Sequence, residues 1–496
     1  MVGLCECCIL AASIQIIIRL NWITMFAKHQ YNWIIIVLLL FLPGFVRSQA
    51  SDPGTFSQEQ FFQMILANHP VARQASLLGA EADAYILKAR GGFDPKLKGD
   101  WEQKSFDGKN YFTIGEVGFS VPTWYGIEVK GAYHWNDGIF LNPERTLPAG
   151  GQAEIGVEFS LLQGLMIDER RATLQQARIM QQLNEAERLS ILNDLLMEAN
   201  EVYWDWSFSY QVVRIYEEAL RLAEIRFDGI YFRYQQGFNA AVDTLESGIQ
   251  VQNRRVSLQE ARLNLQNAEL ALSTFLWTQD DVPLVFDSSP VAPPMEGLDF
   301  LRITQTELND LARMLRTQHP DLMQYIYQLD QLMVDERLKR EMLKPELSMR
   351  YSLLGDRFNF NSFQQENDGT IQNILGQNYK WGFSARFPLF LRKQRADLSL
   401  NQIKQQQTTF KQSQKQLSLE NKLEMYANNT NTILQQINAF EGIVQDTRNL
   451  LQAENDRFTL GSSSLFLINS REVKLIETQE KLANLQAKFQ KNRVAI

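Results

Sequence analysis

Cysteine is almost absent from this chain of 496 residues. The three cysteines lie within the first eight positions, so no disulfide or thiolate metal site is possible further along. Histidine is scarce, with four in the chain, and no glycine-rich phosphate-binding loop occurs. We therefore expect no catalytic residues, no metal site and no cofactor, and we do not expect an enzyme.

An excess of positive charge is also missing. Lys and Arg number 49 against 57 for Asp and Glu, which gives a formal net charge of -8. This balance argues against a nucleic-acid partner. Hydrophobic residues make up 45% and charged residues 21%, which excludes both a disordered chain and a polytopic helical membrane protein.

The apolar run at residues 33–45 resembles the central region of a signal peptide. It follows Lys28 and His29, ends in small and polar residues, and is too short to span a membrane as a helix. We interpret residues 1–48 as a signal peptide, with Met25 as an alternative start. Cleavage after Ser48 or after Ala50 fits equally well, and a buried N-terminal helix is the alternative interpretation.

Prolines and glycines occur in clusters that repeat in the two halves of the chain. A His-Pro pair stands at His69 and at His319, each before a short helical stretch. Later in each half an Arg-aromatic-x-x-Gly sequence ends a long stretch without proline. We predict an internal two-fold repeat. Its segments, in chain order, are short helices (49–92), β-strands (93–162), a long helical hairpin (163–280), a Pro-rich linker (281–300), a short helix (301–344), β-strands (345–390) and a second long helical hairpin (391–496).

Proline is absent between Pro148 and Pro283 and after Pro388. The stretches 168–233 and 392–457 are each 66 residues long, and as helices they would extend about 100 Å. Apolar spacings of three and four predict that a returning helix packs along each of them. The returning helices are shorter, so we expect the short helices to extend their columns. The predicted seam residues are Leu189, Leu192, Leu196, Ala199, Tyr203 and Trp206, and Leu258, Ala261, Leu265, Ala268, Leu272 and Phe275.

Apolar and polar residues alternate in the segments between the helices. Ile155, Val157 and Phe159 alternate with polar residues or glycine, and residues 347–353 and 381–389 behave similarly. Such alternation predicts strands with one apolar face, either in a soluble sandwich or in a membrane barrel with a wet lumen. The first half carries an extra hairpin at residues 111–135, which either widens such a barrel or lies outside it.

With these features the sequence resembles the TolC family of outer-membrane efflux channels over nearly the whole mature chain. The markers are the two His-Pro positions, where the family usually has Asn-Pro, the strand exits at 159–164 and 387–390, and the two Arg-aromatic-x-x-Gly turns. The resemblance implies an α+β fold in which a trimer shares one membrane β-barrel, continuous with a long periplasmic α-helical barrel.

The resemblance also implies the function and the partners. The trimer would be a passive exit duct of an efflux or secretion system, located in the outer membrane and in contact with its lipid. Its helical end would dock a periplasmic adaptor (a membrane fusion protein) that links it to an inner-membrane pump of the RND, ABC or MFS class. The exported substrate and the pump class are left open by the resemblance.

The two turns between long and returning helices are candidate functional sites. Gly237 and Gly461 suit a left-handed residue at the end of a helix, which is also ordinary C-capping. The resemblance implies that these turns form the tunnel tip and contact the adaptor. The flanking candidates are Arg233, Tyr234, Arg457 and Phe458, although Arg in the last turn is also favoured by the helix dipole.

Two acidic residues after the first turn are candidates for a tunnel gate. In the family, carboxylates at these offsets follow the second turn, whereas here Asp243 and Glu246 follow the first. Acidic residues also simply suit the first turn of a helix. Phe466 and Leu467, after the second turn, are the alternative, as a hydrophobic constriction that closes by excluding water.

Two other classes of protein compete with the channel. A coiled-coil structural or interaction protein of the cell surface or periplasm would use the strands as a soluble sandwich. A periplasmic adaptor also has long helical hairpins, but usually one hairpin and a lipoyl-like β domain. Two hairpins in a repeated plan favour the channel.

Overall fold

The computed structural model describes residues 55–284, 290–295, 302–358 and 378–496. The chain divides into the units Met1–Thr55 and Phe56–Ile496, and the second unit holds the helices and strands. The predicted signal peptide, parts of the predicted linker and most of the loop between the last two strands lie outside the described residues. Within them, no helix combines the length and the apolar character needed to cross a membrane.

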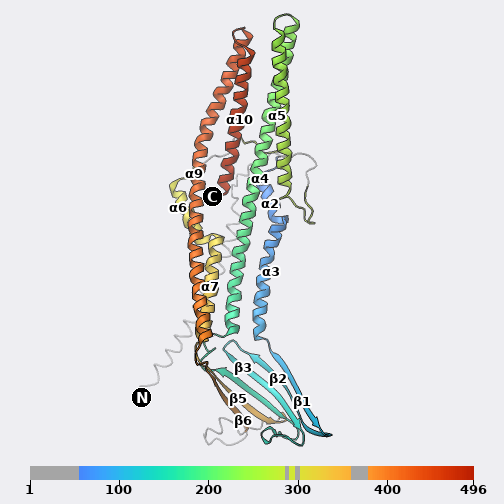
Figure 1. The fold of residues 1–496 in the computed structure, drawn as a ribbon, viewed down its shortest axis with the longest axis vertical. Coiled ribbons are helices and arrows are strands. Elements are labelled where there is room, and N and C mark those ends of the chain that lie inside the picture. Colours follow the sequence, from blue (N-terminus) through green and yellow to red (C-terminus); the bar gives the residue numbers. More distant parts are fainter. Residues whose placement is uncertain (1–54, 285–289, 296–301, 359–377) are drawn as a thin grey trace, which may run out of the picture. The chain divides into compact units, whose positions relative to one another are not determined.

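Two very long helices run through the unit (Figure 1). Helix α4 covers Glu169–Gln235 and helix α9 covers Arg392–Thr459, with 67 and 68 residues. Both begin within one residue of the predicted positions and end two residues beyond them. Asp168 caps α4, because its side chain accepts a hydrogen bond from the backbone N–H of Arg171. The absence of proline allows each helix to continue without interruption.

Within the described residues, six shorter α-helices accompany the two long ones. Helices α5 (Ala241–Ser273) and α10 (Leu465–Val494) return from the ends of α4 and α9. His69 and His319 cap the helices that follow them, because Nδ1 of each ring accepts the backbone N–H two residues on, at 3.2 Å. The helices preceding and following these histidines are α2 (Gln58–Asn68) and α3 (Pro70–Arg90), and α6 (Gln305–Gln318) and α7 (Pro320–Glu341).

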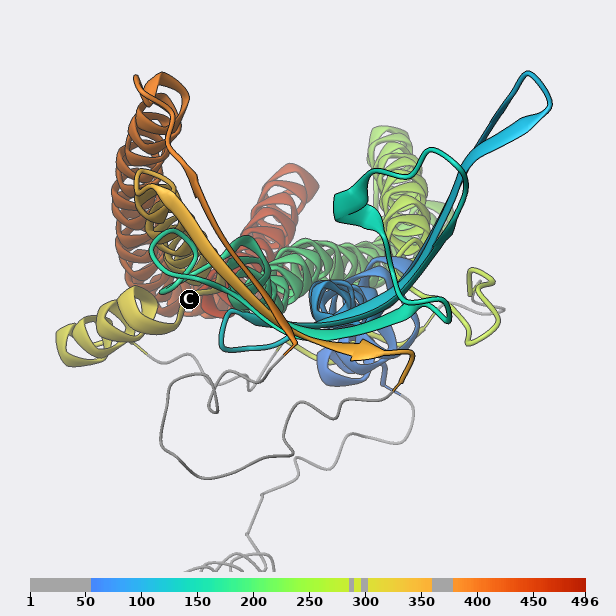
Figure 2. The same cartoon turned by 90° about the horizontal axis from the view of Figure 1, so that it is seen from below.

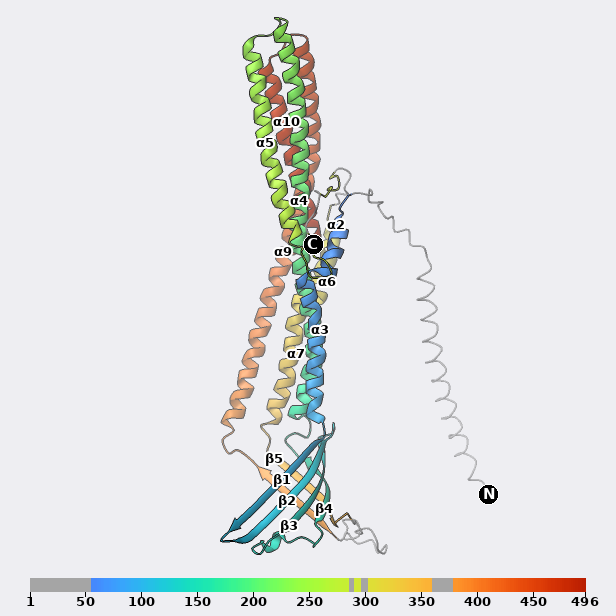
Figure 3. The ribbon, with the colours of Figure 1, turned by 90° about the vertical axis from the view of Figure 1, so that its right-hand side faces the viewer.

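The helices lie in columns that run away from the sheet (Figure 1 and Figure 3). Helix α4 packs against α3 and α5 on one side and against α7 and α10 on the other, and α7 and α10 also pack against α9. The ring of His69 stacks on Phe275 beyond the end of α5, with centroids 5.8 Å apart, and Arg73 pairs with Asp281. Helix α3 therefore extends the column of α5, and the order across the unit is α3/α5, α4, α7/α10, α9.

The main hydrophobic core lies where α2, α4, α5 and α10 meet. Phe61, Tyr203, Trp206 and Leu272 are fully buried there, and the Phe61 and Tyr203 rings stack at 5.6 Å. Most predicted seam residues are buried or half-buried in this cluster. Leu189 is an exception, because its side chain is 40% exposed.

The six strands of the described residues belong to one antiparallel sheet in the order β1-β2-β3-β4-β5-β6. Pairing of β4 with β5 joins the two halves of the chain. The extra hairpin predicted at 111–135 lies inside this sheet, so it widens the sheet rather than standing apart. Figure 2 shows the sheet curving as it crosses the unit. The strands are β1 (Lys96–Phe106), β2 (Lys109–Pro122), β3 (Ile127–Asp137), β4 (Gln152–Ser160), β5 (Glu346–Asp356) and β6 (Tyr379–Arg386).

Candidate functional site

One face of the sheet is apolar and exposed. Strand register places Trp101, Val117, Ile155 and Trp381 on the same face, because residues two apart along a strand point the same way. The Trp101 and Trp381 side chains are 64% and 62% exposed. An exposed apolar surface of this extent is typical of a site that contacts a membrane or another protein. Further exposed members are Leu97, Phe119, Val157, Tyr379 and Phe383.

The opposite face of the sheet is charged. Glu158 on β4 binds Lys130 on β3 at 2.6 Å and Arg350 on β5 at 2.7 Å. Together these residues form a ladder of alternating charge across three strands. A face that carries charges in both signs is stable beside water and would be costly in hydrocarbon.

His134 lies between two carboxylates on this charged face. Its Nδ1 is 3.6 Å from Glu116 and its Nε2 is 3.3 Å from Glu154. The two carboxylates approach opposite ring nitrogens, so they do not converge on one point as metal ligands must. Across the residues that the structure describes, no cluster of three His, Cys, Asp or Glu side chains is arranged to hold a metal ion.

The outer columns of the unit carry exposed apolar stripes that the sequence analysis missed. On α5, Val256 and Leu263 stand about 160° around the helix from Leu258 and Leu265, which face α4. The stripe repeats every seven residues, and this spacing is the signal that would have revealed it. Its exposed members are Val242, Ile249, Val256, Leu263 and Leu270 on α5, and Ile403, Phe410 and Leu417 form a similar stripe on α9.

The two predicted turns have the same geometry. Gly237 and Gly461 adopt positive φ angles of 79° and 76°. The amide of Phe238 donates to the carbonyl of Arg233, and that of Ser462 donates to the carbonyl of Arg457, each at 2.9 Å. This bond across six residues is the Schellman motif, in which glycine avoids the strain of a left-handed residue. The turns are thus explained by local backbone chemistry.

The side chains predicted to flank the turns differ in exposure. Arg233 and Tyr234 are exposed, whereas Phe458 is half-buried. Arg457 donates to the carbonyl of Ser462 at 3.3 Å and lies 3.8 Å from Glu454. At the second turn, Arg457 therefore contacts the turn and its own helix. At the first turn, the side chains of Arg233 and Tyr234 are exposed to solvent.

The four gate candidates occupy different environments. Asp243 accepts from the backbone N–H of Ala240 at 3.3 Å and from Asn239 at 3.0 Å, so it stabilises the start of α5. Glu246 accepts from Asn469 at 3.1 Å and bridges α5 to α10. The structure separates the acidic pair into a cap and an interhelical contact. Of the apolar candidates, Phe466 is 69% exposed and Leu467 is half-buried.

A buried ion cluster lies further from the turns, between three helices. Glu472 on α10 binds Arg226 on α4 at 2.7 Å and lies 4.0 Å from Arg254 on α5. Glu472 and Arg254 are both buried. No short motif marks these residues, because they are far apart in sequence and only the packing of α4, α5 and α10 brings them together.

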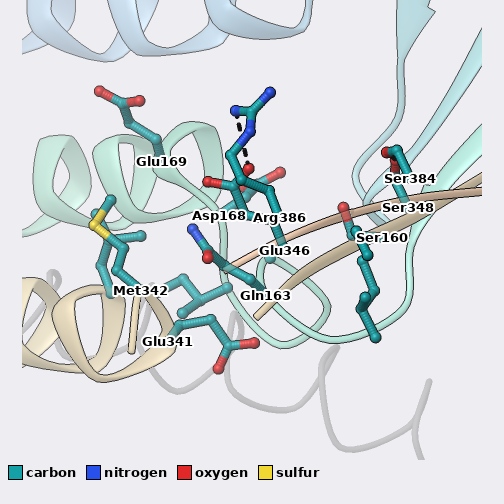
Figure 4. Close-up of a pocket in the computed structure, with 15 residues that line it drawn as sticks. Ser160, Gln163, Asp168, Glu169, Glu341, Met342, Glu346, Ser348, Ser384 and Arg386 are labelled. Carbon is teal, nitrogen blue, oxygen red and sulfur yellow. Dashed lines mark hydrogen bonds and ion pairs between the residues drawn. The ribbon is translucent and has the colours of Figure 1, made fainter. Parts of the chain in front are cut away.

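A groove of about 370 Å³ lies where the sheet meets the helices. Figure 4 shows Glu341, Glu346, Asp168 and Arg386 lining it. Glu346 pairs with Arg386 at 3.2 Å, and Glu341 pairs with Lys344 at 2.6 Å. Because these charges satisfy one another, the groove serves as a structural joint between strand and helix.

Solved structures of outer-membrane proteins resemble the chain. No protein-family profile and no curated protein sequence matches it. The open-state MtrE outer membrane channel of Neisseria gonorrhoeae is 13% identical with a TM-score of 0.61, over 89% of this chain and 88% of its own. CusC, a protein that undergoes transmembrane channel formation, is 16% identical with a TM-score of 0.60, over 90% of this chain and 94% of its own.

The CmeC outer membrane channel of Campylobacter jejuni is similar in the same way. It is 13% identical with a TM-score of 0.58, over 88% of this chain and 84% of its own. At such identities the likeness concerns the fold. The described part of this chain has the TolC-like fold of outer-membrane channels that the sequence resemblance predicts.

Proposed function

We propose that the protein is the outer-membrane exit duct of an efflux or secretion system, formed by three copies of the chain. The observation that carries this proposal is the six-stranded sheet with one exposed apolar face and one charged face. In water the apolar face would be an aggregation hazard. In a membrane it would meet lipid, while the charged face would line a wet lumen.

Closure of the sheet requires more than one copy. Strands β1 and β6 are the two edges of the sheet, and unpaired backbone groups in hydrocarbon cost several kcal/mol each. Three copies would pair each β1 with the β6 of a neighbour. The resulting eighteen strands are an even number within the range known for outer-membrane barrels.

The helical columns support the same assembly. The columns with exposed apolar stripes, α3/α5 and α9, are the outermost ones, on the same two sides as β1 and β6 (Figure 1). One rotation would therefore bring the α3/α5 column against a neighbouring α9 and close both the sheet and the helices. Helices of about 100 Å then enclose a water-filled tunnel in the periplasm.

The turns at Gly237 and Gly461 would form the far end of the tunnel. The exposed Arg233 and Tyr234 offer a charged and an aromatic contact, the kinds of side chain enriched at protein interfaces. A periplasmic adaptor would bind there and link the duct to an inner-membrane pump, which supplies the energy. Glu246 and Phe466, near this end, are the candidates for narrowing the tunnel.

The assembly can be tested on detergent-extracted protein. Electron microscopy should show a hollow threefold particle with a helical stem longer than about 80 Å, and planar bilayers should show discrete conductance steps. A water-soluble monomer without a pore would contradict the proposal and favour the coiled-coil structural protein instead.

A substitution on the outer stripe tests the interface between copies. Val256→Asp with Leu263→Asp should shift the extracted protein from trimer to monomer, because it buries two charges in the proposed contact. Val256→Ile with Leu263→Met keeps the stripe apolar and should leave the trimer intact. Size-exclusion chromatography with light scattering distinguishes the two, and a trimer that survives the aspartates would exclude this stripe from the interface.

A further inference from the structure

Three cations without ion-pair partners stand at one edge of the unit, where β6 leads into α9. Arg392, Lys393 and Arg395 are exposed, and no acidic side chain of the described residues lies within ion-pairing distance of them. Arg392 lies over the ring of Phe390, 5.1 Å from its centroid. Asp397 is the nearest acidic residue in sequence, which leaves a local excess of positive charge.

The helix itself does not explain these cations. They occupy the first turn of α9, where the helix dipole favours acidic residues and disfavours basic ones. The residue before them, Leu391, adopts a left-handed φ of 49° and supplies no capping side chain. A local arrangement that is unfavourable in two ways suggests a partner outside the chain.

A second group of unpaired cations stands at the opposite edge, where α3 leads into β1. Lys88, Arg90 and Lys96 are exposed and form no ion pair with any described residue. Lys88 and Arg90 lie in the last turn of α3, where the helix dipole favours basic residues. The dipole does not account for Lys96, which begins the strand.

Cations at the inner junctions between strand and helix are paired instead. Arg171 binds Asp168 at 3.1 Å, and Lys344 binds Glu341 at 2.6 Å. These junctions lie between the two edges, at the start of α4 and the end of α7. At these strand–helix junctions, the unpaired cations thus lie at the two edges of the unit, which are the surfaces that would meet between copies in the proposed trimer.

Exposed apolar side chains accompany both groups. Leu389 and Phe390 precede the first group, and Leu389 is 85% exposed. Leu97 follows Lys96 of the second group and is 82% exposed, and Leu87 precedes Lys88. Apolar side chains beside unpaired cations match the two parts of a phospholipid, its acyl chains and its phosphate.

We infer that the seam between neighbouring copies binds an anionic phospholipid at the periplasmic boundary of the membrane. This inference rests on the proposed trimer, in which the α9 edge of one copy meets the β1 edge of the next. The two cation groups then face one headgroup from both sides, and Lys and Arg stems reach the boundary as they do at other membrane interfaces. The acyl chains pack along Leu389, Phe390 and Leu97.

The test uses the full-length trimer purified in a neutral detergent. Phosphatidylglycerol, phosphatidylcholine and inorganic phosphate are added separately, and bound lipid is counted by native mass spectrometry while the melting temperature of the trimer is recorded. Phosphatidylglycerol should bind and raise the melting temperature, whereas phosphatidylcholine and phosphate should not. The triple variant Arg392→Gln, Lys393→Gln, Arg395→Gln should weaken phosphatidylglycerol binding about tenfold or more.

A matched triple variant removes three other exposed α9 cations, Lys404→Gln, Lys411→Gln and Lys422→Gln, and should retain the lipid. Equal retention of both lipids, an equal effect of inorganic phosphate, or an equal loss in both triple variants would overturn the inference. Failure to form any trimer would instead contradict the proposed function, so the two failures are distinguishable.

Discussion

The seam within the first hairpin differs in chemistry from the seam between the two hairpins. Between α4 and α5 the buried residues are mainly aliphatic, with Leu258, Ala261 and Leu265 on α5. Between α10 and the first hairpin, apolar packing at Ala483 and Ala487 is joined by polar contacts, with Glu472 held by Arg226 and Asn469 held by Glu246. The first seam depends on apolar area, and the second depends in addition on a few directional contacts.

The two seams should differ in how well they tolerate small shifts of the helices. Burial of apolar area is non-directional, so a seam of leucine and alanine tolerates small shifts without losing its stability. A buried ion cluster is stable only in one arrangement, because separating its partners leaves a buried charge. The structure is therefore most sensitive to single substitutions where the hairpins meet.

Several polar atoms in the seam between hairpins have no hydrogen-bond partner among the described residues. They include Nε and Nη2 of Arg254 and Oδ1 of Asn469. Ser207 on α4 and Gln490 on α10 have buried polar atoms in the same condition. Buried groups of this kind are normally satisfied by ordered water, so we expect water along this seam.

Removing the carboxylate of Glu472, at the centre of the ion cluster, should lower the stability of the protein most. Glu472→Ala leaves the buried Arg254 and the half-buried Arg226 without their anion, and breaking a buried pair typically destabilises by about 3–5 kcal/mol. We expect a lower melting temperature and faster proteolysis near both turns. Glu224→Ala is the control, because its ion pair with Arg255 at 3.2 Å is exposed and such pairs contribute about 0–1 kcal/mol. Similar losses in both variants would contradict the special role of the polar seam.

Truncation within the apolar seam should have a comparable or somewhat smaller effect. Leu265→Ala removes a buried side chain, for which about 2–5 kcal/mol is typical. Because apolar packing is non-directional, Leu265→Met should recover most of the loss. No such recovery is expected at the ion cluster for Glu472→Gln, which still lacks the charge. Melting temperatures of the four variants measure the recovery at each seam. Equal recovery at both seams would contradict the proposed difference between them.

Neutralising Glu246 should have a smaller effect and also tests the gate. Glu246→Gln keeps a hydrogen-bond acceptor for Asn469 but loses its charge, which typically changes stability by about 1 kcal/mol. If Glu246 narrows the tunnel, single-channel recordings should show weaker cation selectivity and weaker block by divalent cations. Asp243→Asn, which alters the helix cap, is the comparison variant. Unchanged selectivity and block in both would remove the pair from the gate.

The smallest expected effect is a pH dependence at the histidine caps. Burial lowers the pKa of His319 below its usual value, with Asp321 and Asp194 opposing this shift and Lys415 reinforcing it. Burial likewise lowers the pKa of His69, with Glu198 opposing. Above about pH 6.5 both rings are neutral in the folded and unfolded states. As the pH falls below that value the unfolded state binds protons more readily, so stability is lost.

A helix cap is typically worth about 1 kcal/mol, which bounds the loss expected at each histidine. Asparagine also caps helices and does not titrate in this range. His69→Asn with His319→Asn should therefore keep stability at pH 7.5 and flatten its decline toward pH 5. Melting temperatures across this range provide the measurement, and an unchanged slope in the double variant would assign the decline to other groups.

The long helices and their turns were predictable because their causes are local. Proline-free stretches set the extent of α4 and α9, and glycine was expected where the chain turns, at Gly237 and Gly461. The strands were predictable for a similar reason, since alternation along one segment already reports its two faces. The position of the extra hairpin in the sheet was not predictable. Strand order depends on pairing between different segments, and the pattern within one segment does not show which segment it pairs with.

Within the candidate site, predictability followed the same division. The exposed stripe on α5 repeats every seven residues and was readable in principle. The cluster of Glu472, Arg226 and Arg254 carries no spacing signal, because its members come from three helices. Leu189 was expected to be buried and is exposed, since periodicity shows which residues share a face but not how far a neighbouring helix covers it.

The sequence by itself determined the parts of this protein whose energetics are local, namely the helices, the alternating strands and the glycine turns. Only the tertiary structure decided that one sheet joins both halves, that the hairpins meet through buried charge, and that unpaired cations stand at the two outer edges. The reason is physical: backbone propensity acts over a few residues, whereas burial and charge pairing depend on which distant segments come into contact.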